Sequence, residues 1–270
     1  MTSLVVWVAV DQRGPSSAYI ATDSRISWPA GTPGDPHWNG ARKTYATTRG
    51  AHIMGYVGDV LFPALTLPTV TAQLDECPDD ETIESAQARV LELVTAAWRG
   101  APPQLRLESQ IVHCCRIGSA MPSKFGVQIL RLPAGETRWT TTDLQVPAVS
   151  SKIEFLGSGR PQLEKNHRAW VKPTGSEKDR TSRAVFSAFC DAVGSGADAL
   201  TGGAPQLVGL YRQGPGRTFG VRWQGKTYLH GTEVSGTELT NLEYRNSRLE
   251  RVNSAGTLLA GAQRHANRPT

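Results

Sequence analysis

The pattern of hydrophobic and polar residues begins with strands. Residues 3–10 are mostly apolar and β-branched, which predicts a buried strand, and turn residues at 11–16 lead into a returning strand over 18–27. A loop rich in glycine and proline follows at 28–40. Residues 43–59 then predict two short strands joined at Arg49 and Gly50. The first sixty residues therefore indicate sheet structure.

Helical spacing begins near Val60. Residues 61–74 predict one helix, and residues 79–98 predict a second, clearer one that opens with acidic residues. Acidic side chains suit a helix N-terminus, where the helix dipole is positive. The second helix carries an apolar stripe, which indicates one buried face. The stripe consists of Ile83, Val90, Leu91 and Val94.

The second half returns to strands with one further helix. Strands are predicted at 109–118, 124–132, 137–144, 152–159, 206–214, 217–223 and 225–230. A helix over 181–196 has Thr181 or Ser182 as its N-terminal cap. Blocks of strands separated by helices predict a layered α+β fold with two packed sheets. We expect one domain over 1–235 and a C-terminal extension over 236–270, formed by a helix from about Glu238 and a flexible tail.

Composition and charge exclude several classes of protein. The chain is 39% hydrophobic and 20% charged, as in ordinary globular proteins, and its apolar runs are too short to span a membrane. The N-terminus lacks the features of a signal peptide, so we expect a cytoplasmic protein. The net charge is +5, but the basic residues are scattered among acids, which argues against specific binding of nucleic acid.

The four cysteines form no metal-binding pattern. Cys114 and Cys115 are adjacent, no CxxC pair occurs, and no second cluster completes a ligand set. We expect buried thiols on a strand. The sequence implies neither a metal nor an organic cofactor.

Thr2 offers a nucleophile at the start of the chain. Methionine is generally removed when the second residue is small, which would leave threonine as the first residue. Its hydroxyl needs a base to take its proton, and a free α-amine, with a reference pKa near 8, can do so on the same residue. Taken alone, a Met-Thr start is a common and weak signal.

A series of short motifs follows Thr2 in order. They are ATDSRIS at 21–27, Lys43 after the loop, GYVGD at 55–59, GSG at 157–159 and DALTGG at 198–203. Together with the threonine-led first strand, this series resembles the family of proteasome β-subunits and HslV-type peptidases, up to about residue 230. The resemblance implies a four-layer αββα sandwich of the N-terminal nucleophile hydrolase type.

The resemblance also implies a role for each motif. Thr2 would be the nucleophile, Lys43 would lower the pKa of its hydroxyl, and Asp23 would orient Lys43. Gly58 would offer its backbone N–H to the oxyanion. A hydrogen-bonded network would hold the threonine amine, formed by Ser158, Asp198 and Thr201, where Thr201 stands in place of the family's usual serine.

Substrate and partners follow from the same resemblance. A peptide or unfolded protein would lie as an extended strand between the ATDSRIS and GYVGD segments, beside Arg25 and Ser27. Tyr56 and Val60 would shape the pocket before the scissile bond. Members of this family assemble into rings supplied by an ATPase, which implies a homo-oligomeric ring and an AAA+ partner.

Two other functions are compatible with these residues. The first is an N-terminal nucleophile amidohydrolase that acts on a small amide through the same Thr2 chemistry. The second is a catalytically inert, proteasome-like assembly subunit. Thr2, Asp23, Lys43 and Asp198 occur together, which favours an enzyme, because a scaffold needs none of them.

Overall fold

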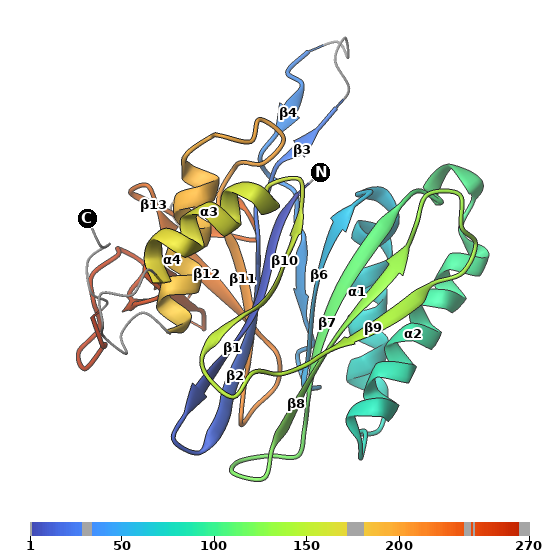
Figure 1. The fold of residues 1–270 in the computed structure, drawn as a ribbon, viewed down its shortest axis with the longest axis horizontal. Helices are drawn as coiled ribbons and strands as arrows, with labels where there is room; N and C mark the ends of the chain where they lie inside the picture. The colour runs from blue at the N-terminus through green and yellow to red at the C-terminus, as the bar shows by residue number, and fades with distance from the viewer. Residues whose placement is uncertain (1, 29–33, 172–180, 235–238, 240, 265–270) are drawn as a thin grey trace.

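The computed structural model describes residues 2–28, 34–171, 181–234, 239 and 241–264. These residues form a mixed α/β fold with two main sheets and four α-helices (Figure 1). The predicted division of the sequence into blocks of strands and helices is confirmed for most elements.

The N-terminal hairpin lies inside the larger sheet. β1 (Ser3–Asp11) runs antiparallel to β2 (Gly14–Thr22), and each is also paired on its other side. Central strands of this kind are buried on both faces, which explains the continuous apolar run of β1. The sheet order is β10 (Ser151–Gly157), β1, β2, β11 (Gln206–Tyr211), β12 (Arg217–Trp223), β13 (Lys226–Leu229) and β14 (Thr232–Glu233).

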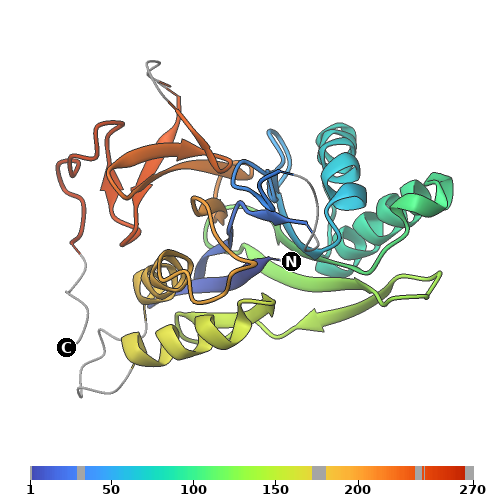
Figure 2. The ribbon, with the colours of Figure 1, turned by 90° about the horizontal axis from the view of Figure 1, so that it is seen from above.

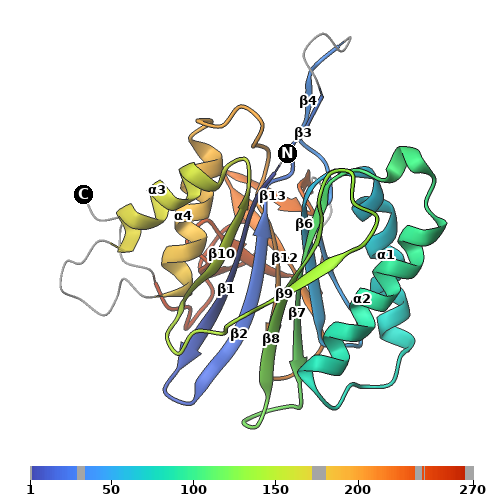
Figure 3. The same ribbon diagram turned by 45° about the vertical axis from the view of Figure 1, so that its right-hand side comes forward.

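The second sheet is a five-stranded antiparallel meander, apart from one long insertion. Its order is β5 (Thr44–Ala46), β6 (His52–Gly58), β7 (Ser109–Ile117), β8 (Lys124–Leu132) and β9 (Thr140–Leu144). Within the predicted loop at 28–40, β4 (His37–Trp38) pairs with β3 (Ile26–Ser27), and this small hairpin projects from the body of the molecule (Figure 3). Residues 29–33 lie outside the described part.

Helices α1 (Leu61–Glu76) and α2 (Ile83–Gly100) form the insertion between β6 and β7, and a short 3₁₀ turn (Pro103–Leu105) follows them. α2 begins four residues later than predicted. The Thr82 hydroxyl accepts a hydrogen bond from the Ser85 N–H (3.0 Å), and the Ser85 hydroxyl accepts one from the Thr82 N–H (3.3 Å). This reciprocal capping box sets the start of the helix. None of the helices that the structure describes is long and apolar enough to cross a membrane.

The remaining helices pack together on the larger sheet. α4 (Ser182–Gly194) begins after Thr181, whose hydroxyl accepts a hydrogen bond from the Ala184 N–H (3.2 Å), so Thr181 is the cap. α3 (Arg160–Val171) was not predicted. Its twelve residues are mostly polar, and the buried positions are limited to Leu163, Asn166 and Trp170. Three buried residues, at intervals of three and four, form too sparse a stripe for the sequence pattern to distinguish a helix from a loop.

The helix predicted from about Glu238 is wrong for the described residues of the extension. β15 (Glu243–Asn246) pairs in parallel with β12, and β16 (Arg251–Val252) pairs antiparallel with β15. Tyr244 is buried with its ring against Gly220 of β12, which is distant in the sequence, so the local pattern alone misleads. Residues 265–270 lie outside the described part, so the flexible tail expected at the end of the extension stays a prediction there.

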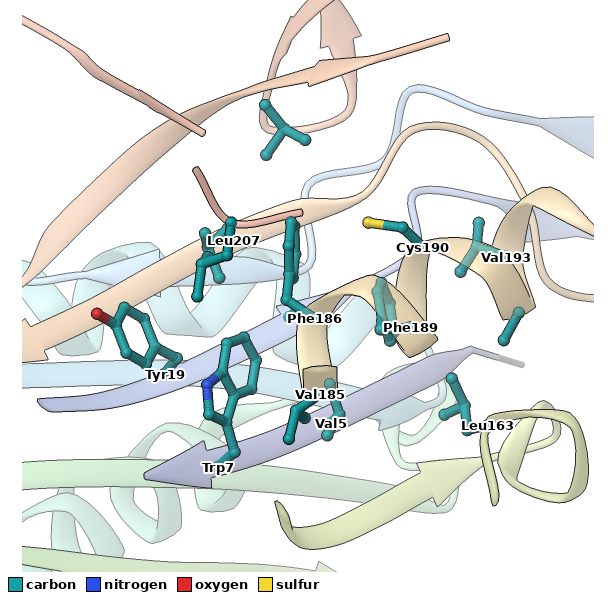
Figure 4. Packing of buried hydrophobic residues seen from close by; sticks show 14 of the residues in the cluster. Val5, Trp7, Tyr19, Leu163, Val185, Phe186, Phe189, Cys190, Val193 and Leu207 are labelled. Carbon is teal, nitrogen blue, oxygen red and sulfur yellow. The ribbon is translucent and has the colours of Figure 1, made fainter. Parts of the chain in front are cut away.

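Apolar contacts hold the sheets and helices together as successive layers. α3 and α4 cover one face of the larger sheet, the opposite face packs on the second sheet, and α1 and α2 cover the outer face of the second sheet (Figure 2). Under α4, the Trp7 ring stacks on Tyr19 and Phe186, with ring centroids 5.1 and 6.0 Å away (Figure 4). The site described below lies at one end of the contact between the sheets.

The prediction of buried thiols on a strand is confirmed for the two cysteines of β7. Cys114 and Cys115 are both fully buried thiols, and burial raises the pKa of Cys115 to about 12. Cys190 is buried on α4, whereas Cys77 follows α1 and is half-buried. Among the residues that the structure describes, no group of three or more His, Cys, Asp or Glu side chains is arranged to hold a metal ion.

A buried histidine pair makes stability depend on pH. His52 Nδ1 lies 3.0 Å from His113 Nε2, and His113 Nδ1 lies 3.1 Å from Gln128 Nε2. Burial lowers the pKa of both histidines below the value of about 6.5 that they recover on unfolding. Below pH 6.5 the unfolded chain therefore binds more protons, and stability is lost as the pH falls.

We expect the free energy of unfolding to fall below pH 6.5 by up to about 1.4 kcal/mol per pH unit for each buried histidine. Urea unfolding at several pH values measures this slope. His113→Gln should reduce the slope. An equal slope in wild type and His113→Gln would contradict the assignment.

Candidate active site

The N-terminal hairpin brings Thr2 and Asp23 to the same end of the larger sheet. Thr2 directly precedes β1 and Asp23 directly follows β2, and these strands are antiparallel with Leu4 opposite Thr22. The Asp23 N–H donates to Ser3 O (3.2 Å), and the Ser3 N–H donates to Asp23 Oδ1 (3.0 Å). Residues 21 positions apart are therefore neighbours because the hairpin closes behind them.

Lys43 reaches this pair from the second sheet. It directly precedes β5, and its Nζ donates to Thr2 Oγ1 (3.0 Å), Asp23 Oδ1 (3.0 Å) and Arg25 O (2.5 Å). Thr2, Asp23 and Lys43 are each 0% exposed. A fully buried ammonium group at this distance from a hydroxyl stabilises negative charge on its oxygen.

Asp23 compensates the buried charge of Lys43. Its Oδ1 accepts from Lys43 and from the Ser3 N–H, and its Oδ2 accepts from the N–H groups of Arg25 (3.2 Å) and Gly202 (3.1 Å). Every oxygen of the carboxylate is thus occupied, as a buried charge requires. Burial lowers the pKa of Lys43, and the adjacent Asp23 carboxylate opposes this change.

A second polar network lies beside the first. Asp198 Oδ2 accepts hydrogen bonds from the hydroxyls of Ser158 (2.9 Å) and Thr201 (2.8 Å). The Thr201 hydroxyl is also 3.1 Å from the Ser3 hydroxyl. Burial raises the pKa of Asp198, but hydrogen bonds from the Leu200 N–H and these two hydroxyls outweigh it, so the pKa lies below its ordinary value.

Ser3 was missed by the sequence analysis. It links the two networks, because its N–H bonds Asp23 and its hydroxyl lies beside Thr201. Ser3 is 2% exposed, and only the fold reveals its partners, which lie 20 and 198 positions away. Its position directly after the predicted nucleophile was the one available signal.

Thr2 and Gly58 line one cavity of about 880 Å³, together with Gly157 and Ser158. Gly58 has φ +96°, and a Cβ there would lie 2.7 Å from Glu108 O, so the position requires glycine. The Asp59 N–H donates to Glu108 O on the β7 side (2.8 Å). Gly58 thus brings backbone without a side chain to the cavity that Thr2 also lines.

Arg25 and Ser27 contact the loop that follows α4. Arg25 Nη1 donates to Ala199 O (3.0 Å) and its Nε to Asn39 Oδ1 (2.9 Å), while the Ser27 hydroxyl donates to Leu200 O (3.4 Å). These bonds hold the loop that carries Thr201. Contact of Arg25 and Ser27 with substrate stays a prediction.

Tyr56 and Val60 do not line this cavity in the described part of the chain. Tyr56 is 0% exposed and packs in the core between the second sheet and α1 and α2, where its hydroxyl donates to Arg42 O (3.2 Å). Val60 packs against the same core. Side chains alternate along a strand, so it is Val57 that faces the cavity with Thr2.

The sequence matches no protein-family model and no curated protein. Among solved structures, this chain is similar to eukaryotic HslV from Trypanosoma brucei, with 14% identity over 77% of this chain and 99% of that chain and a TM-score of 0.45. It is also similar to Anbu from Hyphomicrobium sp. strain MC1, with 12% identity over 77% and 82% and a TM-score of 0.47. Anbu (ancestral β-subunit) from Yersinia bercovieri gives 10% identity over 80% and 86% and a TM-score of 0.48. Values this low carry no argument about activity, which must come from the geometry.

Proposed function

We propose that the protein is a threonine-type endopeptidase that attacks peptide bonds with Thr2 after removal of Met1. One observation carries the proposal: Lys43 Nζ bonds both Thr2 Oγ1 and Asp23 Oδ1 at 3.0 Å in a fully buried site. A buried lysine that bonds a hydroxyl at the start of the chain has no evident structural purpose, because a hydrophobic pair would fill the space at lower cost.

In the proposed mechanism, the freed α-amine of Thr2 takes the proton of its own hydroxyl as Oγ1 attacks the carbonyl carbon. Lys43 lowers the cost of negative charge on Oγ1, and Asp23 keeps Lys43 charged and in place. Collapse of the tetrahedral intermediate releases the amine product, which receives the proton, and leaves an ester on Thr2. Water then hydrolyses this ester and regenerates the hydroxyl.

The surrounding residues support the same roles. Gly58 lines the same cavity as Thr2, which supports a role of its N–H in stabilising the oxyanion. Ser158, Asp198 and Thr201 would bind the α-amine, since Ser158 lines the cavity with Thr2. The order helix pair, sheet, sheet, helix pair supports the proposed four-layer αββα sandwich of an N-terminal nucleophile hydrolase.

The assembly and setting belong to the same proposal. We expect a peptide or unfolded-protein substrate, a cytoplasmic homo-oligomeric ring and an AAA+ ATPase that delivers substrate. Size-exclusion chromatography with light scattering measures the oligomeric state, and a mass equal to one chain would contradict the ring.

A second candidate is an amidohydrolase that acts on a small amide. The cavity of about 880 Å³ falls within the size range of sites for small ligands, which favours this alternative to a peptide groove. The proposed Thr2 chemistry is the same, so the two candidates differ in substrate length. The inert assembly subunit is the third reading, and it predicts no chemistry at Thr2.

Intact mass before and after incubation with a peptide epoxyketone tests the proposal. This reagent requires both the hydroxyl and the free amine of an N-terminal threonine. We expect loss of Met1 and one adduct per chain, and no adduct in Thr2→Ala. Loss of Met1 without an adduct would favour the small-amide enzyme. Retention of Met1 without an adduct would overturn the proposal and leave the inert subunit.

A further inference from the structure

Gln206 is a buried polar residue that the proposed chemistry does not use. It is the first residue of β11 in the larger sheet, where it pairs with Thr22 of β2, and it is 1% exposed. Its side chain extends from the larger sheet to the segment that begins β5 in the second sheet. A glutamine in this place costs free energy unless all its polar atoms find partners.

The Gln206 amide is fully occupied. Its Oε1 accepts from the Lys43 N–H (2.9 Å) and from the Thr44 hydroxyl (3.4 Å). Its Nε2 donates to Asp23 O (3.2 Å) and to Ala41 O (2.6 Å). Two acceptor and two donor bonds use the complete capacity of the group.

These partners belong to the two segments that meet at Thr2. Asp23 ends the β2 segment, whereas Ala41, Lys43 and Thr44 belong to the β5 segment. One further backbone bond joins the same segments, from the Ala41 N–H to Ser24 O (3.0 Å). Gln206 binds the backbone of both charged residues, Asp23 through its carbonyl and Lys43 through its N–H.

We infer that Gln206 is a positioning residue for Thr2 chemistry: it fixes the distance between Asp23 and Lys43 and thereby holds Lys43 Nζ on Thr2 Oγ1. This inference rests on the proposed function. The physical reason is that Asp23 follows a strand of the larger sheet and Lys43 precedes a strand of the second sheet, so their separation depends on bonds between the two sheets. A displacement of about 1 Å at a reacting group can cost about 100-fold in rate. Gln206 itself touches no reacting atom.

Two substitutions separate the parts of this role. Gln206→Met keeps the length of the side chain and removes all four hydrogen bonds. Gln206→Glu keeps the acceptor to Lys43 and Thr44, loses the donors to Asp23 and Ala41, and adds a negative charge close to Lys43. That charge favours protonated Lys43. The pH profile of Thr2 modification should therefore lie at higher pH than in wild type.

Gln128→Met is the matched control. Gln128 of β8 is 2% exposed and bonds Gln87 O of α2 (3.0 Å) and His113 Nδ1 of β7 (3.1 Å). This substitution also removes buried hydrogen bonds, but to residues that do not bond Gln206. Its rate of inactivation shows how much a general loss of stability alone slows the modification of Thr2.

The experiment measures the rate constant of inactivation (kinact) and the binding constant (KI) of the epoxyketone from pH 6 to 9. We expect kinact to fall roughly 10- to 100-fold in Gln206→Met with KI little changed, and to stay within about twofold of wild type in Gln128→Met. In Gln206→Glu the pH profile of kinact should shift upward. Wild-type kinact and pH profile in both Gln206 variants, or an equal loss in Gln128→Met, would overturn the inference.

Failure of the proposed function would give a different result, namely no adduct in wild type. Crystal structures of wild type and Gln206→Met then decide the inference. A separation of Lys43 Nζ from Thr2 Oγ1 or Asp23 Oδ1 beyond hydrogen-bond distance in the variant supports it. An unchanged arrangement of these three atoms overturns it, whatever the protein catalyses.

Discussion

Lys43→Met is expected to slow modification of Thr2 by an epoxyketone about 100- to 1,000-fold. The ammonium group bonds Thr2 Oγ1 at 3.0 Å, and both residues are 0% exposed, so the charge has a larger effect than at the surface. Time-resolved intact mass measures the rate. Lys226→Met is the matched control, because Lys226 forms an exposed ion pair with Glu233 (2.7 Å), and its labelling should equal wild type.

The same substitution is expected to lower stability by about 3–5 kcal/mol, since it leaves Asp23 as a buried charge without its counter-ion. The double variant Asp23→Asn/Lys43→Met removes both charges and should recover part of this loss. It should remain as slow as the single variant toward the epoxyketone. Recovery of labelling together with stability would show that Lys43 supports the fold and not the chemistry of Thr2.

Phe186→Ala is expected to lower the free energy of unfolding by about 3–5 kcal/mol. Phe186 is 0% exposed on α4, and its ring lies 6.0 Å from Trp7 and 6.4 Å from Phe189 (Figure 4). Removal of the ring leaves a cavity between the helix layer and β1, which the aromatic neighbours can fill only in part. Urea unfolding measures the loss.

Leu65→Ala provides the comparison for a large apolar side chain. Leu65 is 63% exposed on the outer side of α1, so its loss should change the free energy of unfolding by no more than about 0.5 kcal/mol. A loss in Phe186→Ala as small as in Leu65→Ala would show that α4 does not pack on the larger sheet as described.

Local sequence patterns predicted the elements whose own residues show a clear apolar run or stripe. β1, β6, β7 and β8 carry long apolar or β-branched runs, α2 carries an apolar stripe after acidic residues, and α4 follows a hydroxyl cap. The failures are segments whose burial depends on distant partners. α3 is mostly polar, and its buried Leu163 and Trp170 depend on contacts with the larger sheet and α4. β15 forms a strand by pairing with β12.

The sequence by itself determined the candidate chemistry: a threonine able to become the first residue, and an aspartate and a lysine in motifs that resemble one peptidase family. Only the tertiary structure decided which residues meet. It brought Lys43 onto Thr2 and Asp23, placed Tyr56 in the opposite core, and added Ser3 and Gln206. The physical reason is that strand spacing encodes which face a side chain takes, whereas contact between the two sheets is set by packing over the whole chain.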